Sequence, residues 1–193
     1  MFDGFIPDTE IGPYNDYGVP PYVPFGVRDV TIGPNGLNDT TQGLNHKWWA
    51  AYFDSSNDII IEDVDLSSTT VVLNEPDGVV NIALAFDQNA NDTYAYITGL
   101  GDLKIRFFDG SIPGDTILNI GSAQSVTMTM DMKYYPSSPS SDILLFYIRS
   151  NAIYYRLQRD KYAIEYATPV TAGANRLHDS GIRQDYGFQV RWS

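Results

Sequence analysis

The chain has 193 residues, 43% of them hydrophobic and 19% charged, with 24 acidic residues against 12 basic ones. This length fits one domain, or one domain with an extended arm. The net charge of -12 argues against sequence-specific nucleic-acid binding, because neutralising phosphates needs a surplus of Lys and Arg. The chain has no cysteine, which excludes disulfides, thiolate nucleophiles and cysteine-ligated metals.

The first residues carry neither the positive region nor the apolar region of a signal peptide. No stretch approaches the run of ~18 apolar residues that a membrane-spanning helix needs. We therefore expect neither a signal peptide nor insertion into a membrane.

Residues 1–36 differ from the rest of the chain because they hold six of its eleven prolines. Proline fixes φ and removes a backbone donor, so we expect an extended arm rather than a helix or a central strand. A disordered linker would be poor in aromatic residues, which gain from burial. The arm packs on its own domain in one interpretation and docks on a neighbouring subunit in the other. The predicted assembly-interface residues are Phe2, Phe5, Tyr14, Tyr17, Tyr22 and Phe25.

Residues 37–193 are predicted to form a β domain of two or three similar units. Apolar or alternating segments separated by Gly, Pro, Asn and Asp are typical of strands and turns. No segment has the pattern of a convincing amphipathic helix; the best candidate is a short stretch near 45–52, and Trp48-Trp49 suits a buried strand as well. The predicted fold class is all-β and antiparallel. Strands are expected at 79–86, 93–97, 103–107, 125–130, 143–148, 153–157, 162–167 and 186–192.

A weak internal repeat indicates how these strands are grouped. In two segments a strand ending in Tyr-Ile precedes a polar hairpin and a strand with a central Arg, and a degraded third copy lies upstream. The segments are 91–109, 141–160 and 48–63. Their matched tyrosines, Tyr52, Tyr96 and Tyr147, are 44 and 51 residues apart, close to the ~40–50-residue period of propeller blades. Such meanders must stack to bury their faces, either as a β-sandwich with two similar halves or as an open propeller-like stack.

One segment resembles the start of a calcium-binding loop. Residues 87–92 read DQNAND, with oxygen-bearing side chains at the first, third and fifth positions. The sixth position is Asp92 instead of Gly, and the twelfth is Thr98 instead of Glu. The favoured interpretation is a polar hairpin loop, with a weak surface Ca²⁺ site as the alternative. No cofactor is predicted.

The remaining titratable clusters give no reaction mechanism. Glu62, Asp63 and Asp65 could include the paired carboxylates of a glycosidase, but acids on a strand edge that prevent edge-to-edge pairing are the favoured interpretation. His46 and His178 have no metal-binding spacing, and no G-x-S-x-G motif accompanies them. We predict no catalytic, cofactor-binding or metal-binding residue and no enzymatic activity, with a propeller-type glycosidase as the least favoured hypothesis.

Aromatic side chains suggest a second function, because exposed aromatic faces stack on sugars. Most aromatic residues in strands belong to a core, and Tyr134-Tyr135 before the 136–141 loop are the best surface candidates. The sugar-binding candidates are Trp48, Trp49, Tyr134, Tyr135 and Trp192. A carbohydrate-binding or receptor-binding β module is therefore the alternative function.

Charge is distributed unevenly along the chain. Seven of the twelve basic residues lie in the last 45 positions, whereas acids gather between 54 and 77. This asymmetry predicts a charge-complementary contact, either between the two halves or between neighbouring subunits.

Residues 141–165 (SDILLFYIR, then IYYRLQRDKYAIE) resemble a pattern in small β-rich virion proteins of tailed bacteriophages, encoded among tail or head–tail genes. The segments 125–131 and 188–192 fit the same pattern, so the resemblance covers about residues 80–192. It implies a non-enzymatic structural protein of the virion tail, made in the host cytoplasm. The implied partners are other copies and neighbouring virion proteins. The resemblance transfers no catalytic residue and does not extend to the arm or to Trp48-Trp49.

Overall fold

The computed structural model describes residues 28–33, 47–64, 66–87, 91–110, 115–130, 142–182 and 188–193. These residues form antiparallel strands and one 3-10 turn, with no α-helix among them, so the all-β prediction is confirmed. The predicted interface residues of the arm, from Phe2 to Phe25, lie outside the described residues.

Three four-stranded meanders follow one another along the chain, and a hairpin ends it. The first sheet contains β1 (Arg28–Gly33), β2 (Lys47–Phe53), β3 (Asp58–Asp63) and β4 (Ser68–Asn74). The second contains β5 (Val79–Phe86), β6 (Asp92–Thr98), β7 (Asp102–Phe108) and β8 (Asp115–Ser122). The third contains β9 (Ser125–Met130), β10 (Ile143–Arg149), β11 (Ala152–Leu157) and β12 (Tyr166–Ala167). The hairpin pairs β13 (Leu177–Ile182) with β14 (Phe188–Trp192).

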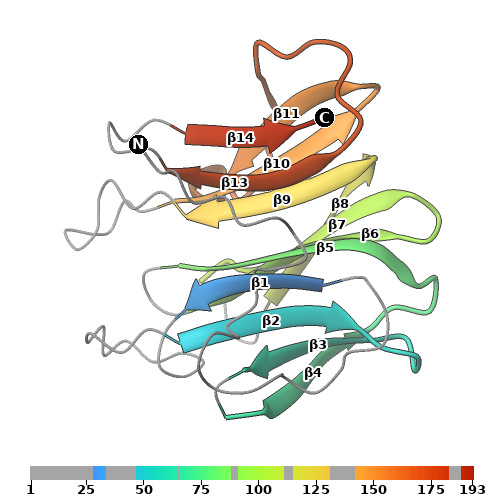
Figure 1. Cartoon of the computed structure of the whole chain (residues 1–193), viewed down its shortest axis with the longest axis vertical. Coiled ribbons are helices and arrows are strands. Elements are labelled where there is room, and N and C mark those ends of the chain that lie inside the picture. The colour runs from blue at the N-terminus through green and yellow to red at the C-terminus, as the bar shows by residue number, and fades with distance from the viewer. Residues whose placement is uncertain are drawn as a thin grey trace.

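The first sheet lies at the bottom of Figure 1, the second sheet lies above it, and the third sheet and the hairpin lie together at the top. The first strand of each unit contacts the first strand of the next, so β1, β5, β9 and β13 lie in series. Of the two predicted architectures, the open stack describes this arrangement, because successive layers bury one another's faces.

Three apolar cores lie between the layers. The first lies between the first and second sheets, the second between the second and third, and the last between the third sheet and the hairpin. Alternation along a strand sends neighbouring side chains to opposite cores. Tyr96 of β6 therefore joins the first core, while Ile97 joins the second. Most of β5 and β6 in the second sheet is consequently buried on both faces.

The matched residues of the internal repeat occupy equivalent positions in successive sheets. Tyr52, Tyr96 and Tyr147 each lie in the second strand of a sheet. Their partners on the third strands are Ile60, Lys104 and Tyr154. Arg106 and Arg156 each stand two residues beyond that partner. The pattern in the sequence thus corresponds to equivalent positions in successive sheets.

Most expected strands are present, and one is largely absent. Between 158 and 165 the chain forms a 3-10 turn and a loop, so only Tyr166–Ala167 is a strand in the segment expected at 162–167. Lys161 and Tyr162 have φ values of 50° and 57°, a left-handed conformation that no strand accommodates. Alternating Tyr and Ile side chains suggested a strand here, but the backbone bends instead.

The described part of the segment 45–52 is strand β2, in agreement with the strand alternative for Trp48-Trp49. One further expectation needs correction. Strand β1 lies inside the segment assigned to the arm and pairs with β2, so 28–33 belong to the first sheet. Strands β4, β8 and β13 were also not predicted from the sequence.

Candidate functional site

A hollow of about 690 Å³ lies between the third sheet and the hairpin. Its volume is within the range of ordinary ligand pockets. The lining is predominantly apolar and aromatic, and it comes from both layers. The lining residues are Leu144, Phe146, Ile153, Tyr155, Leu157, Arg159, Ala167, Thr168, Pro169, Val170, Val190 and Trp192.

A row of aromatic rings crosses the third sheet on the side of the hollow. Phe146, Tyr155 and Tyr166 are register partners on β10, β11 and β12. Ring centroids are 5.9 Å apart for the first two and 5.0 Å for the last two. Cross-strand aromatic pairs of this kind stabilise a sheet while presenting apolar faces.

Among the described residues the last unit has two strands, and the hollow lies beside them over the third sheet. Each earlier unit covers its neighbour with four strands, whereas β13 and β14 cover only part of the third sheet. Val190 of β14 packs on this last core, and Trp192 lines the hollow with 42% of its surface exposed. The outer part of the third sheet is therefore left beside an open apolar space.

The wall of the hollow formed by 158–170 is fixed by polar contacts. Asp142 pairs with the guanidinium of Arg159 and accepts a 2.8 Å hydrogen bond from its backbone N–H. The hydroxyl of Tyr166 donates to Asp160 over 2.8 Å, and that of Thr168 donates to the carbonyl of Ile153 over 2.8 Å. These bonds hold the segment without a long strand.

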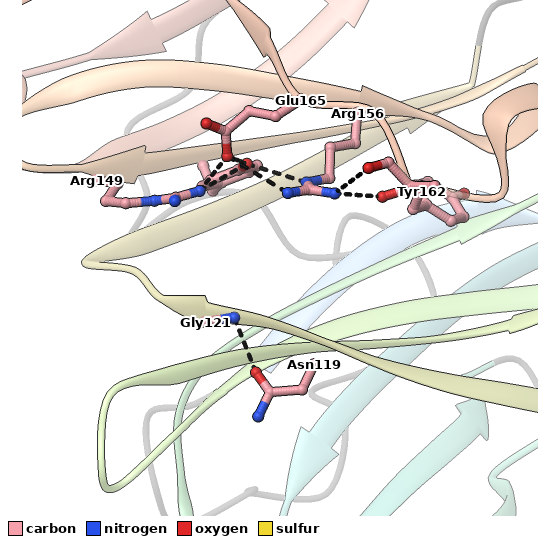
Figure 2. Close-up of polar contacts among 8 residues, drawn as sticks. Asn119, Gly121, Arg149, Arg156, Tyr162 and Glu165 are labelled. Atoms are coloured by element: carbon pink, nitrogen blue, oxygen red, sulfur yellow. Dashed lines mark hydrogen bonds and ion pairs between the residues drawn. The ribbon is translucent and has the colours of Figure 1, made fainter.

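An ionic network on the opposite face of the third sheet supports the same wall (Figure 2). The carboxylate of Glu165 pairs with Arg149 and Arg156 and accepts a hydrogen bond from the hydroxyl of Tyr147. Arg156 also donates from Nε to the Tyr147 hydroxyl over 3.1 Å and from Nη1 to the carbonyl of Tyr162 over 2.6 Å. The network ties the loop that carries Glu165 to β10 and β11.

The charge states follow from this geometry. Burial raises the pKa of Tyr147, and its hydrogen bond to Glu165 raises it further, so the hydroxyl stays protonated and donates. Burial alone would raise the pKa of Glu165. The Tyr147 hydrogen bond and the charges of Arg149 and Arg156 outweigh burial and lower that pKa. Glu165 is therefore an anion that links its loop to β10 and β11.

Equivalent pairs occur in the other two sheets. The hydroxyl of Tyr96 donates to Glu75 over 3.0 Å, and Lys104 pairs with the same carboxylate over 2.8 Å. Burial raises the pKa of Tyr52, and the nearby Glu62 carboxylate raises that pKa further. Each matched tyrosine of the repeat thus has a glutamate partner. Because this Tyr–Glu pair recurs in all three sheets, it is a structural feature of the unit.

Residues 87–92, which resemble the start of a calcium-binding loop, form a polar turn in their described part. The backbone N–H of Asn91 donates to Asp87 Oδ1 over 2.9 Å, and its side-chain amide donates to Asp87 Oδ2 over 3.0 Å. Asp92 pairs with Arg106 over 3.3 Å. Residues 88–90 lie outside the described part of the chain. No cluster of three potential metal ligands occurs among the described residues.

The acidic cluster is not a strand edge. Strand β3 lies between β2 and β4, so the edge location expected for Glu62 and Asp63 is wrong. The two residues are buried, and as strand neighbours they point to opposite faces of the sheet. Asp63 accepts a 3.2 Å hydrogen bond from the N–H of Leu66, while Asp65 lies outside the described residues.

The structure separates the predicted sugar-binding aromatics. Trp49 is in the first core, 5.3 Å from the ring of Phe86, and Trp48 is half-buried on the other face of β2. Trp192 lies in the hollow. Tyr134 and Tyr135 are outside the described residues.

The remaining candidates are not brought into one site. His178 is exposed and hydrogen-bonded to the hydroxyl of Ser193 over 2.9 Å, whereas His46 lies outside the described residues. Arg149 and Arg156 pair within the third sheet, so these two late arginines do not join the halves of the chain.

The chain matches no known protein family, no curated protein and no solved structure. Across the described ranges, none of the secondary structure is a helix long and apolar enough to cross a membrane. Sequence reasoning found Trp192 but missed the hollow, because Phe146, Tyr155 and Leu157 had the pattern of ordinary core strands. The feature that would have indicated the hollow is the smaller number of described strands in the last unit than in the three before it.

Proposed function

We propose that this chain is a non-enzymatic structural protein of a virion, a component of a bacteriophage tail or head–tail region. It assembles with other copies of itself and with neighbouring virion proteins. The observation that supports this proposal is the incomplete stack: three four-stranded units end in a two-stranded one, beside an apolar hollow. Stacked repeats need a terminal cover for their apolar faces.

The resemblance of 141–165 to phage virion proteins supports the same proposal. This segment includes β10, β11 and the loop bearing Glu165, so it builds one side of the hollow and the network behind it. A net charge of -12 also suits a protein that lies beside a DNA conduit, since it repels phosphate.

Sedimentation velocity of the full chain, with and without residues 1–27, tests this function. The deletion keeps β1, which belongs to the first sheet. We expect a multimer that becomes a monomer when the arm is removed, with an unchanged β-sheet circular dichroism spectrum. A full chain that stays monomeric at all concentrations, alone and with the neighbouring virion proteins, would contradict the proposal.

A carbohydrate-binding module is the second candidate, favoured by Trp192 and Tyr155, which both line the hollow. It predicts that host polysaccharide changes the tryptophan fluorescence of the full chain and that Trp192→Ala abolishes the change. Unchanged fluorescence at millimolar sugar would eliminate this candidate.

A further inference from the structure

We infer that the hollow is the receptor site for the N-terminal segment 1–27 of a second copy of this chain. This inference rests on the proposed function and names the two surfaces that meet. The occupant is an acidic, aromatic-rich extended peptide, and the receptor is the space beside β14 over the outer strands of the third sheet.

The geometry of the repeat locates the receptor. β13 contacts β9 just as β5 contacts β1, so β13 and β14 take the first and second places of a fourth unit. The third and fourth places would lie over β11 and β12, where Tyr155, Leu157 and Ala167 line the hollow. An extended segment placed there completes the layer. Adding an extended segment to an incomplete sheet is a common mode of peptide recognition.

The lining selects an apolar and aromatic occupant. Leu144 and Leu157 are register partners on this face, beside the row formed by Phe146 and Tyr155. Trp192 forms the opposite side, with 42% of its surface exposed. Aromatic rings bury large areas and pack on one another in offset or edge-to-face pairs. The hollow can therefore accept aromatic anchors.

Residues 1–27 supply this chemistry. The segment contains all six aromatic residues of the predicted interface, together with four acidic residues and no Lys or Arg. The lining of the hollow contains one basic residue, Arg159, whose side chain is 56% exposed, and no acidic residue. A basic group at the hollow favours encounter with an acidic segment.

We assign the segment to a second copy because the proposed function needs contacts between copies, and the cross-linking test below distinguishes this from docking within one chain. Residue 28 starts β1 in the first sheet, and the second and third sheets separate that sheet from the hollow (Figure 1). A segment that leaves one stack at its first sheet and fills the last unit of another connects copies head to tail. Such a heterologous contact generates rings or filaments.

Because the chain has no cysteine, disulfide trapping between full-length copies tests the inference cleanly. One copy carries a cysteine in the arm, as Phe5→Cys, Tyr14→Cys or Tyr22→Cys in three separate variants. The other copy, with a size tag, carries Pro169→Cys, an exposed position in the lining. The control carries Leu100→Cys, which is 76% exposed in the turn between β6 and β7.

At least one arm position should cross-link to Pro169→Cys about tenfold faster than to Leu100→Cys, because docking raises the effective concentration of the two thiols. Equal rates at both sites would overturn the inference. Cross-linking only within a chain that carries both cysteines, and none between copies, would also overturn it. If the full chain sediments as a multimer while trapping fails, only the inference is lost; a chain that stays monomeric in every condition removes the proposed function as well.

Discussion

The two faces of the third sheet differ in how completely they are covered. One face packs on the four strands of the second sheet, and Leu145 and Tyr147 are fully buried there. In the part of the chain that the structure describes, the other face meets β13 and β14, and its outer part lines the hollow. The same strands therefore supply a closed core on one side and an open apolar site on the other.

This difference shows how a repeat architecture separates stability from binding. Complete layers bury side chains between two sheets, which is where most of the stabilising apolar area lies. The last layer is incomplete, so part of its neighbour remains available to a partner. Changes at the closed face should therefore reduce stability, whereas changes at the hollow should mainly reduce association.

The largest expected effect is on the free energy of unfolding, when a leucine is replaced by alanine on each face of the third sheet. Leu145→Ala should lower the free energy of unfolding by about 2–5 kcal/mol, because it leaves a cavity in a closed core. Leu157→Ala should cost about 1 kcal/mol, because Leu157 is only partly buried and already borders open space. Urea unfolding followed by circular dichroism measures both. An equal loss of unfolding free energy in both variants would contradict a difference in coverage between the two faces.

The ionic network gives a smaller, pH-dependent effect. Glu165→Gln should cost about 1–2 kcal/mol at pH 7, since charge-assisted hydrogen bonds are lost. The folded state lowers the pKa of Glu165 below its ordinary 4.5. The stabilisation is therefore complete above about pH 4.5 and disappears as the pH falls through the lowered value. Unfolding measured from pH 7 to pH 3 should show the variant and the parent converging; a constant difference would contradict the assigned charge state.

The smallest expected loss of stability is at Trp192. Trp192→Ala should cost about 1 kcal/mol or less, because this side chain lies at an open site. Trp49→Ala, the control, should cost about 3–5 kcal/mol, because Trp49 is 4% exposed in the first core. Thermal unfolding compares the two variants. A Trp192→Ala loss as large as that of the control would mean that Trp192 is core rather than part of a binding surface.

Much of this fold was predictable from local patterns. The strands expected at 79–86 and 125–130 coincide with β5 and β9, because β-branched residues lie within them and turn signals flank them. The repeat of Tyr96 and Tyr147 placed equivalent strands in successive sheets. Local pattern failed at Lys161, where the backbone adopts a positive φ that only the surrounding contacts impose.

The site was harder to predict than the fold. Tyr155 and Leu157 have the pattern of ordinary strand residues, and nothing local distinguishes a covered face from an open one. That distinction depends on how many strands the next unit supplies, which is a property of the tertiary arrangement. The glutamate partners of the matched tyrosines were also missed, because Glu75 and Glu165 lie outside the strands that carry Tyr96 and Tyr147.

The mass of two full-length variants in solution tests directly whether the protein assembles through the hollow. Val170→Arg places a charge in the lining of the hollow, whereas Val80→Arg makes the same change at a 58% exposed position of β5. With both variants folded by circular dichroism, sedimentation velocity should give a monomer for Val170→Arg and the parent multimer for Val80→Arg. A Val170→Arg variant that assembles as fully as the parent would contradict assembly through the hollow.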